Sequence, residues 1–321
     1  MKATLRRLGN GQQAGIIGII IVLLVVSEVI NPFTFAPANL VEVLRATSIY
    51  FIAACASTLL LVGGGLDLSI GSVFAIGGVS VGLLLNANVF WPLAVLLAIA
   101  ISAAFGVVNA YLVVALKVPP FITTLGMYFA ASGIVTVVTG GAALAGFPVG
   151  FSDFGQQSLF GIPFLVYYAI VIGVIFHLLL NHTRFGYNAR ILGGNANAAR
   201  ANGVAVRRVS SILYVVSATV AGLCGVLLTA RVSTADPAAG GAGFTFQVLA
   251  AVIIGGTSLF GGVGTIAGTA LGALLFSVIN NVLALVHANP LWLNIATGVI
   301  LITAVAFDQF RRSHQFRVGS K

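Results

Sequence analysis

Charged side chains are scarce in this chain. Only 7% of its 321 residues are charged, whereas 59% are hydrophobic. A soluble domain carries about a quarter charged residues, so a soluble globule of this composition would lack the polar side chains to cover its surface. The apolar excess must face lipid, and the composition predicts an all-α integral membrane protein.

Groups that carry out catalysis or bind metals are also missing. The three lysines are Lys2, Lys117 and Lys321, and none follows a glycine as the Walker A motif for ATP requires. The four histidines show no ligand spacing with cysteine or acidic residues, so we expect no metal site. The two cysteines lie in apolar runs, which is typical of buried structural residues. We expect neither an enzyme nor a cofactor-binding chain.

The few basic residues are clustered. Twelve of the fifteen Lys and Arg residues fall in three segments without Asp or Glu: the N-terminal tail 2–7, the stretch 184–208 and the C-terminal tail 311–321. Such clusters beside apolar spans mark the cytoplasmic side of a membrane protein. Nucleic-acid binding is not expected, because no separate basic domain exists.

About ten transmembrane helices are predicted, since a span needs roughly 20 apolar residues. The segments are 14–30, 47–62, 71–87, 91–116, 121–139, 163–181, 209–230, 246–257, 264–286 and 291–307. With ten crossings both termini and the segment 182–208 are cytoplasmic, and the loop 140–162 lies outside. We expect one transmembrane domain over residues 1–321. The segment 246–257 is the weakest, so broken or tilted helices are expected near it.

The first apolar run also resembles a signal peptide, because a basic tail precedes it and Ala36-Pro37-Ala38 follows it. The run is longer than a usual signal sequence, so we expect it to remain as the first span.

Glycine is frequent, with 39 residues, and two Gly-rich stretches predict breaks in helices. Gly64-Gly65-Leu66-Asp67-Leu68 recurs in form as Gly255-Gly256-Thr257-Ser258-Leu259, and each follows an apolar segment. Transporters place broken helices at equivalent points of duplicated halves. An internal duplication remains open from two short matches. The expected helix-break glycines are Gly64, Gly65, Gly71, Gly255, Gly256, Gly261 and Gly262.

Asp67 is the one carboxylate in the middle of a long apolar stretch. A charge at membrane depth is expensive, so such a residue faces a cavity, a partner or a helix end. Asp67 or Ser69 can cap the helix that follows, and this interpretation is favoured. Contact with a substrate and a proton relay remain alternatives.

The arginine-rich segment contains a helix signal of its own. Asn195 can cap a short helix through Ala201, and Gly203 can close it. So short a helix needs something to pack on. The segment is therefore either a solvated loop or a helix that docks on a cytoplasmic partner.

Four blocks of the sequence resemble the permeases of bacterial ribose, xylose and galactose-type importers. Residues 64–72 are similar to GGIDLSVGS and residues 118–126 to VPPFIATLG. Residues 183–200 resemble TRFGR…GGNEEAAR, and residues 250–265 resemble AAVVIGGTSLSGGRGT. The blocks keep the family's order over nearly the whole chain.

The resemblance implies a pore subunit of an ATP-binding-cassette (ABC) sugar importer in the bacterial inner membrane. Its partners would be ATPase subunits that hold ATP and Mg²⁺, a second permease subunit, and a periplasmic or lipid-anchored sugar-binding protein. The ATPase-coupling residues would be Arg184, Phe185, Gly186, Gly193, Gly194, Asn195, Ala199, Arg200 and Gly203. Ala196 and Asn197 stand where the family has two glutamates, which implies a partner with a matched surface.

Polar and aromatic residues near the helix breaks are candidates for the sugar path. They are Asp67, Ser69, Phe121, Thr123, Asn280 and Asn281. For the asparagine pair, hydrogen bonding between helices is the simpler interpretation. An ion-coupled secondary transporter and a membrane scaffold are the rival functions, and the sequence does not choose the sugar.

Overall fold

The computed structural model describes the backbone of residues 2–289 and 291–318, and the side chains of residues 13–289, 291–306 and 309. The described chain is almost entirely helical. Its long helices are α1 (Lys2–Ile30), α2 (Pro37–Val62), α3 (Ile70–Asn86), α4 (Trp91–Ala110), α5 (Pro120–Thr139), α7 (Phe164–His182), α10 (Val206–Val232), α11 (Gly241–Ile254), α12 (Ile266–Leu285) and α13 (Leu291–Val318).

Each of the ten predicted segments overlaps one of these helices, although 246–257 runs past the end of α11 into a break. Within the described residues, seven helices are long and apolar enough to cross a membrane. The apolar parts of α3, α11 and α13 are shorter. The chain is thus an all-α, multi-pass membrane protein. Both short helices α3 and α11 border a predicted helix break, which fits the expectation that helices are broken there.

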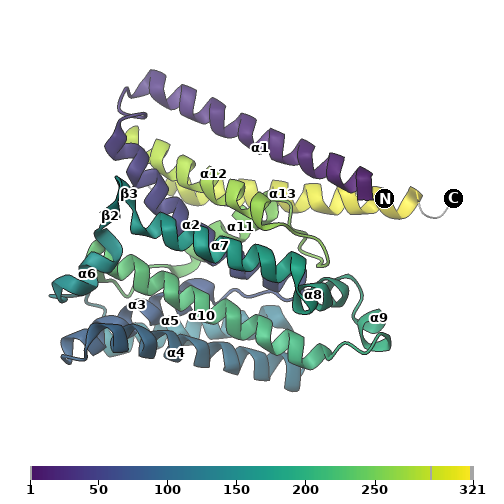
Figure 1. Cartoon of the computed structure of the whole chain (residues 1–321), viewed down its shortest axis with the longest axis horizontal. Helices are drawn as coiled ribbons and strands as arrows, with labels where there is room; N and C mark the ends of the chain where they lie inside the picture. Colours follow the sequence, from purple (N-terminus) through teal and green to yellow (C-terminus); the bar gives the residue numbers. More distant parts are fainter. Residues whose placement is uncertain (1, 290, 319–321) are drawn as a thin grey trace.

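Smaller elements cap the two ends of the bundle. At one end lie α6 (Val149–Gln156) and two short antiparallel pairs, β1 (Leu144–Ala145) with β4 (Thr234–Ala235) and β2 (Ser158–Leu159) with β3 (Ile162–Pro163). At the opposite end lie α8 (Arg184–Gly194) and α9 (Ala196–Ala201), beside the start of α1 and the end of α13 (Figure 1). The described parts of the three segments that carry the basic clusters therefore share one end of the molecule.

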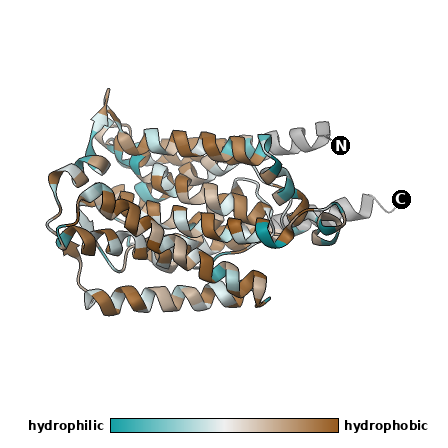
Figure 2. Cartoon of the chain, turned by 60° about the horizontal axis from the view of Figure 1, so that its bottom comes forward, coloured by the Kyte–Doolittle hydropathy of each residue, from teal (hydrophilic) through white to brown (hydrophobic). Residues whose placement is uncertain are grey.

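The most buried helices are α2, α3, α10 and α11, and α10 packs against α2, α3 and α4. Outer helices turn apolar side chains away from the protein, as at Val22, Val137 and Ile302. Hydrophobic residues colour the long helices along most of their length, and hydrophilic residues gather toward the ends (Figure 2). Lipid is the solvent that such a surface requires.

Glycine allows a close contact between α3 and α10. A Cβ added at Gly225 of α10 would overlap the carbonyl oxygen of Phe74 and come within 2.9 Å of the Gly78 amide nitrogen of α3. In lipid, helices gain little from hydrophobic attraction to each other, and small residues let their backbones pack closely instead. By contrast, a Cβ at Gly133 of α5 meets nothing within 4 Å.

We predict that Gly225→Ala lowers the thermal stability of the purified protein and that Gly133→Ala does not. A methyl at Gly225 forces α3 and α10 apart, and overpacking of this kind costs about 1–3 kcal/mol. Alanine also favours a helix interior over glycine by up to about 1 kcal/mol, so Gly133→Ala should be neutral or stabilising. Thermal unfolding in detergent measures both. A Gly225→Ala protein as stable as the parent would contradict this packing.

Candidate functional site

Two stretches of non-helical backbone interrupt the bundle. The first break is residues 63–69, between α2 and α3, and the second break is residues 255–265, between α11 and α12. Both were expected from their glycines. Because lipid offers no hydrogen bonds, such backbone is tolerated only where protein surrounds it or where it faces water.

The same cap opens both breaks. Gly64 follows α2 with a left-handed φ of 78°, while its amide and that of Gly65 donate to the carbonyls of Leu61 (2.9 Å) and Leu60 (3.0 Å). Gly256 follows α11 with a φ of 91°, and the amides of residues 256 and 257 repeat this pattern on residues 253 and 252. This is the Schellman motif, in which glycine ends a helix.

The expected match of Gly64-Gly65 to Gly255-Gly256 is one residue out of register. At the cap, Gly63 corresponds to Gly255 and Gly64 to Gly256. Sequence similarity aligned the glycine pairs, whereas the position of the last helical residue decides which glycine takes the left-handed conformation.

The arginine-rich segment folds into two helices, of which one was expected. Thr183 caps α8 by accepting a hydrogen bond from the Gly186 amide (3.1 Å). The Asn195 side chain caps α9 by accepting from the amides of residues 197 and 198 at 2.9 and 3.0 Å. Gly203, with a φ of 77°, closes α9. The predicted cap and closure of the short helix are confirmed, whereas helix α8 was not anticipated.

Gly193 of α8 lies against both breaks. Its Cβ, if present, would overlap the carbonyl oxygen of Val62 and come within 2.7 Å of the Gly262 amide nitrogen and 3.0 Å of the Gly64 amide nitrogen. The two breaks are joined there directly, because the Gly262 amide donates to the Val62 carbonyl at 2.8 Å. We call these four residues the glycine junction. A Cβ at the next residue, Gly194, meets nothing within 4 Å.

Arg190 of α8 makes a second contact with the second break. Its guanidinium donates to the Gly264 carbonyl oxygen at 3.2 Å and to the Asn181 side-chain oxygen at 2.9 Å. Partial burial lowers the pKa of this guanidinium from its ordinary value. Arginine nevertheless stays protonated in proteins, so the contact remains a charge-assisted hydrogen bond. Sequence reasoning did not single out Arg190.

The expected coupling residues lie on both faces of this segment. Arg184, Gly194 and Arg200 are exposed, so they are accessible to a partner. Gly186 and Ala199 are buried, and Phe185 packs against the core. One face of the segment therefore packs against the core and the other face is exposed. The sequence alternatives, a solvated loop or a docking helix, did not include packing on this chain's own core.

Asp67 is buried in the first break and has three hydrogen bonds. One carboxylate oxygen accepts from the Ser69 amide (2.8 Å) and the Ser69 hydroxyl (2.5 Å), and the other accepts from Ser217 of α10 (2.9 Å). Asn109 of α4 donates to the Ser69 hydroxyl at 2.9 Å. The carboxylate thus ties the break to two neighbouring helices.

The expectation that Asp67 or Ser69 caps α3 with its side chain is wrong in detail. Ser69 occupies the N-cap position, but its side chain makes no capping bond, and Asp67 lies two residues earlier. The Gly71 amide instead donates to the Thr245 hydroxyl of α11 at 2.9 Å. A residue from another helix satisfies the α3 terminus, and a local sequence signal does not reveal such a residue.

The sequence analysis did not identify Ser217 and Asn109, although the sequence contains a feature that could have revealed them. Each is a buried polar residue inside a long apolar span. Polar side chains at that depth face the protein interior and bind one another.

The structure does not bring the six candidate path residues together. Asp67 and Ser69 lie in the first break, whereas Asn281 pairs with Asn39 near the start of α2 at 2.6 and 3.0 Å. Helix α2 has 26 residues, or roughly 39 Å, so these sites lie at its opposite ends. Asn280 donates to the carbonyl of its own helix, at residue 276.

Phe121 and Thr123 lie in the first turn of α5. The Phe121 ring is exposed, and the Thr123 hydroxyl is buried without a hydrogen-bond partner among the described residues. Their role in a sugar path stays a prediction.

Comparison with known proteins finds similarity to transport permeases over most of the chain. The family model described as "Branched-chain amino acid transport system / permease component" matches residues 39–305. The ribose import permease protein of Escherichia coli strain K12 is 34% identical over 92% of this chain and 93% of its own length. The galactose/methyl galactoside import permease of the same strain is 33% identical over 94% and 95%, and its D-allose transport system permease is 33% identical over 84% and 83%. No solved structure matches.

We predict that Ser217→Ala destabilises the protein more than Ser57→Ala. Loss of the Ser217 hydroxyl leaves a buried carboxylate oxygen unpaired, which costs about 1–3 kcal/mol. Ser57 is equally buried, but its hydroxyl only adds a bond to the Ala53 carbonyl of its own helix. Thermal unfolding of both variants in detergent tests this, and equal melting temperatures would show that Asp67 does not depend on Ser217.

Proposed function

Because this chain belongs to the family of transport-system permease components, we propose that it forms the membrane pathway of an ATP-driven importer for a monosaccharide. The chain itself is not an enzyme. The observation that carries the proposal is the glycine junction, where the segment that resembles the ATPase-coupling element lies against both helix breaks. The relatives are named for ribose, galactose and allose, which supports a simple sugar without selecting one.

We place the end with α8 and α9 in the cytoplasm of a bacterial cell and the chain in its inner membrane. Eleven of the fifteen basic residues lie in described parts of the chain that share this end (Figure 1). The positive-inside rule then puts both termini in the cytoplasm. The ten long helices would all enter or cross the bilayer, with α3 and α11 as the short arms of broken helices.

The partners follow from this orientation. ATPase subunits, which hold ATP and Mg²⁺, would dock on the exposed face of α8 and α9. A second permease subunit would complete the pore, and a sugar-binding protein would deliver its cargo at the end with α6 and the short strands. No cofactor in this chain is needed.

Coupling would run through the glycine junction. ATP binding moves the ATPase subunits and with them α8, and α8 cannot move independently of the backbone at Val62, Gly64 and Gly262 that surrounds Gly193. Both breaks therefore shift together, and with them α2–α3 and α11–α12. Rigid-body motion of helix groups about a fixed site is how alternating access is achieved.

The ion-coupled alternative has less support. Such a transporter needs a titratable or ion-coordinating group at mid-membrane. Asp67 is the strongest candidate, but its carboxylate already holds three hydrogen bonds from Ser69 and Ser217. It serves as an anchor of the first break.

The direct test is reconstitution of the permease in liposomes with its ATPase and sugar-binding protein. We expect sugar uptake that requires ATP hydrolysis, and hydrolysis that rises when the loaded binding protein is added. Uptake that persists without the ATPase, or that a proton gradient drives, would contradict the proposal.

We further predict that Gly193→Ala uncouples hydrolysis from uptake, while Gly133→Ala does not. The methyl at residue 193 overlaps the Val62 carbonyl and separates α8 from the breaks, whereas the methyl at residue 133 of α5 has open space. ATP consumed per sugar transported should rise several-fold in Gly193→Ala alone. If the ATP consumed per sugar were unchanged in Gly193→Ala, the glycine junction would not take part in coupling.

A further inference from the structure

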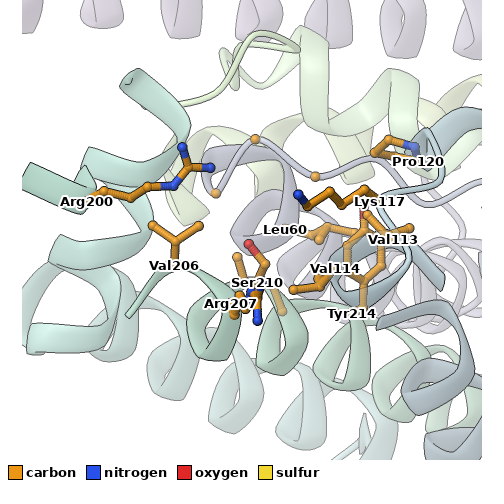
Figure 3. A pocket seen from close by; sticks show the side chains of 14 residues that line it. Leu60, Val113, Val114, Lys117, Pro120, Arg200, Val206, Arg207, Ser210 and Tyr214 are labelled. Carbon is orange, nitrogen blue, oxygen red and sulfur yellow. The ribbon is translucent and has the colours of Figure 1, made fainter. Parts of the chain in front are cut away.

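A cavity of about 450 Å³ lies between the first break and the arginine-rich segment. Its wall includes Gly63–Gly65 of the break, Lys117 from the connection between α4 and α5, Arg200 of α9 and Arg207 of α10. The cationic groups of Lys117 and Arg200 point toward one another across the cavity, and Ser210 and Arg207 of α10 line it below them in this view (Figure 3).

The cavity carries three positive charges without a neutralising group. None of the described residues that line it is Asp or Glu. Among the residues with described side chains, ion pairs form only between Glu42 and Arg45 or Arg231. The nearest carboxylate along the break, Asp67, has its oxygens bound to Ser69 and Ser217.

The backbone holds Lys117 in an unusual position. Helix α4 ends in one π-helical turn, η1 (Tyr111–Ala115), and Lys117 then adopts a left-handed φ of 60°. Lysine rarely takes this conformation, and π-turns frequently mark functional sites. The two features direct the start of α5, at Pro120, along the cavity wall.

The cavity also borders the apolar outer surface. Val113, Val114 and Val206 line it beside the cations. Leu116, Phe121 and Ile122, which flank its Lys117–Pro120 wall, are each more than half exposed. A ligand here meets cations on one side and hydrocarbon on the other.

We propose that this cavity holds the phosphate group of an anionic phospholipid from the leaflet at the α8–α9 end. Arginine and lysine bind phosphate oxygens through charge-assisted hydrogen bonds. Basic pockets between membrane helices on the cytoplasmic side suit lipid head groups. The apolar wall favours a lipid over free phosphate or an acidic protein side chain. The choice of leaflet rests on the orientation in the proposed function.

A lipid in this position would join separate parts of the chain. Its phosphate would bind Arg200 of α9 and Lys117 of the connection before α5, directly beside the first break. Anionic lipid would thereby stabilise the arrangement on which the glycine junction depends.

The test compares lipid retention by the full-length chain, purified with its ATPase partner and exchanged into nanodiscs of phosphatidylglycerol and phosphatidylcholine. Native mass spectrometry, after the protein is released from the nanodiscs, counts the lipids that stay bound to it. The variant is Lys117→Asn with Arg207→Gln, since asparagine tolerates a left-handed φ and neither position is among the expected coupling residues. The matched control is Arg208→Gln, the neighbouring exposed arginine outside the cavity.

We expect the parent and the control to retain phosphatidylglycerol in preference to phosphatidylcholine, and the double variant to lose this retention by at least about tenfold. Equal retention by all three proteins would overturn the proposal. Equal loss in the Arg208→Gln control would also overturn it, because general surface attraction would then suffice. Displacement of the lipid by millimolar inorganic phosphate, or a crosslink from the cavity to an ATPase carboxylate, would assign the site to a different ligand.

Lipid retention is scored without any transport. Failure of ATP-driven uptake would therefore contradict the proposed function without contradicting the lipid site. Equal lipid retention by all three proteins would contradict the lipid site without contradicting the importer.

Discussion

Backbone that leaves the helix within a membrane protein must find its hydrogen bonds in the protein or in water, because lipid offers none. The chain meets this requirement at two places with the same device. A glycine in the left-handed conformation, Gly64 or Gly256, lets the next amides return to the last carbonyls of α2 and α11. Other elements also supply partners, as where the Thr245 hydroxyl of α11 accepts from the Gly71 amide at the start of α3.

This constraint also explains why the arginine-rich segment is attached to the core. The Val62 carbonyl is freed by the end of α2, and it is taken up by the Gly262 amide of the other break. The backbone groups lie so close together that only glycine fits at residue 193. A hydrogen-bond requirement thereby places a surface helix, α8, in contact with both interruptions of the bundle. A displacement of α8 therefore acts directly on both breaks, because no other element lies between them at Gly193.

Composition and charge predicted much of this fold, and local motifs predicted part of the site. Ten apolar segments and the shared end of the basic clusters follow from how residues partition between lipid and water. The Asn195 cap is a local signal and was correctly read. Helix α8 was not, since its eleven residues include three glycines and depend on the Thr183 cap and on burial of Ala189 and Leu192. Contacts among Val62, Gly193 and Gly262 join residues distant in sequence, which no local pattern encodes.

The central claim is that α8 and the second break move as one unit. Spin labels at the exposed residues Tyr187 of α8 and Val263 of the second break, in chains diluted with unlabelled permease, measure this in the assembled transporter. A second, undiluted sample labelled at Tyr187 alone gives the distance between two permease subunits. The Tyr187–Val263 distance should stay constant between nucleotide-free and ATP-bound states, while the distance between subunits changes. A Tyr187–Val263 distance that changes as much as the distance between subunits would contradict the account.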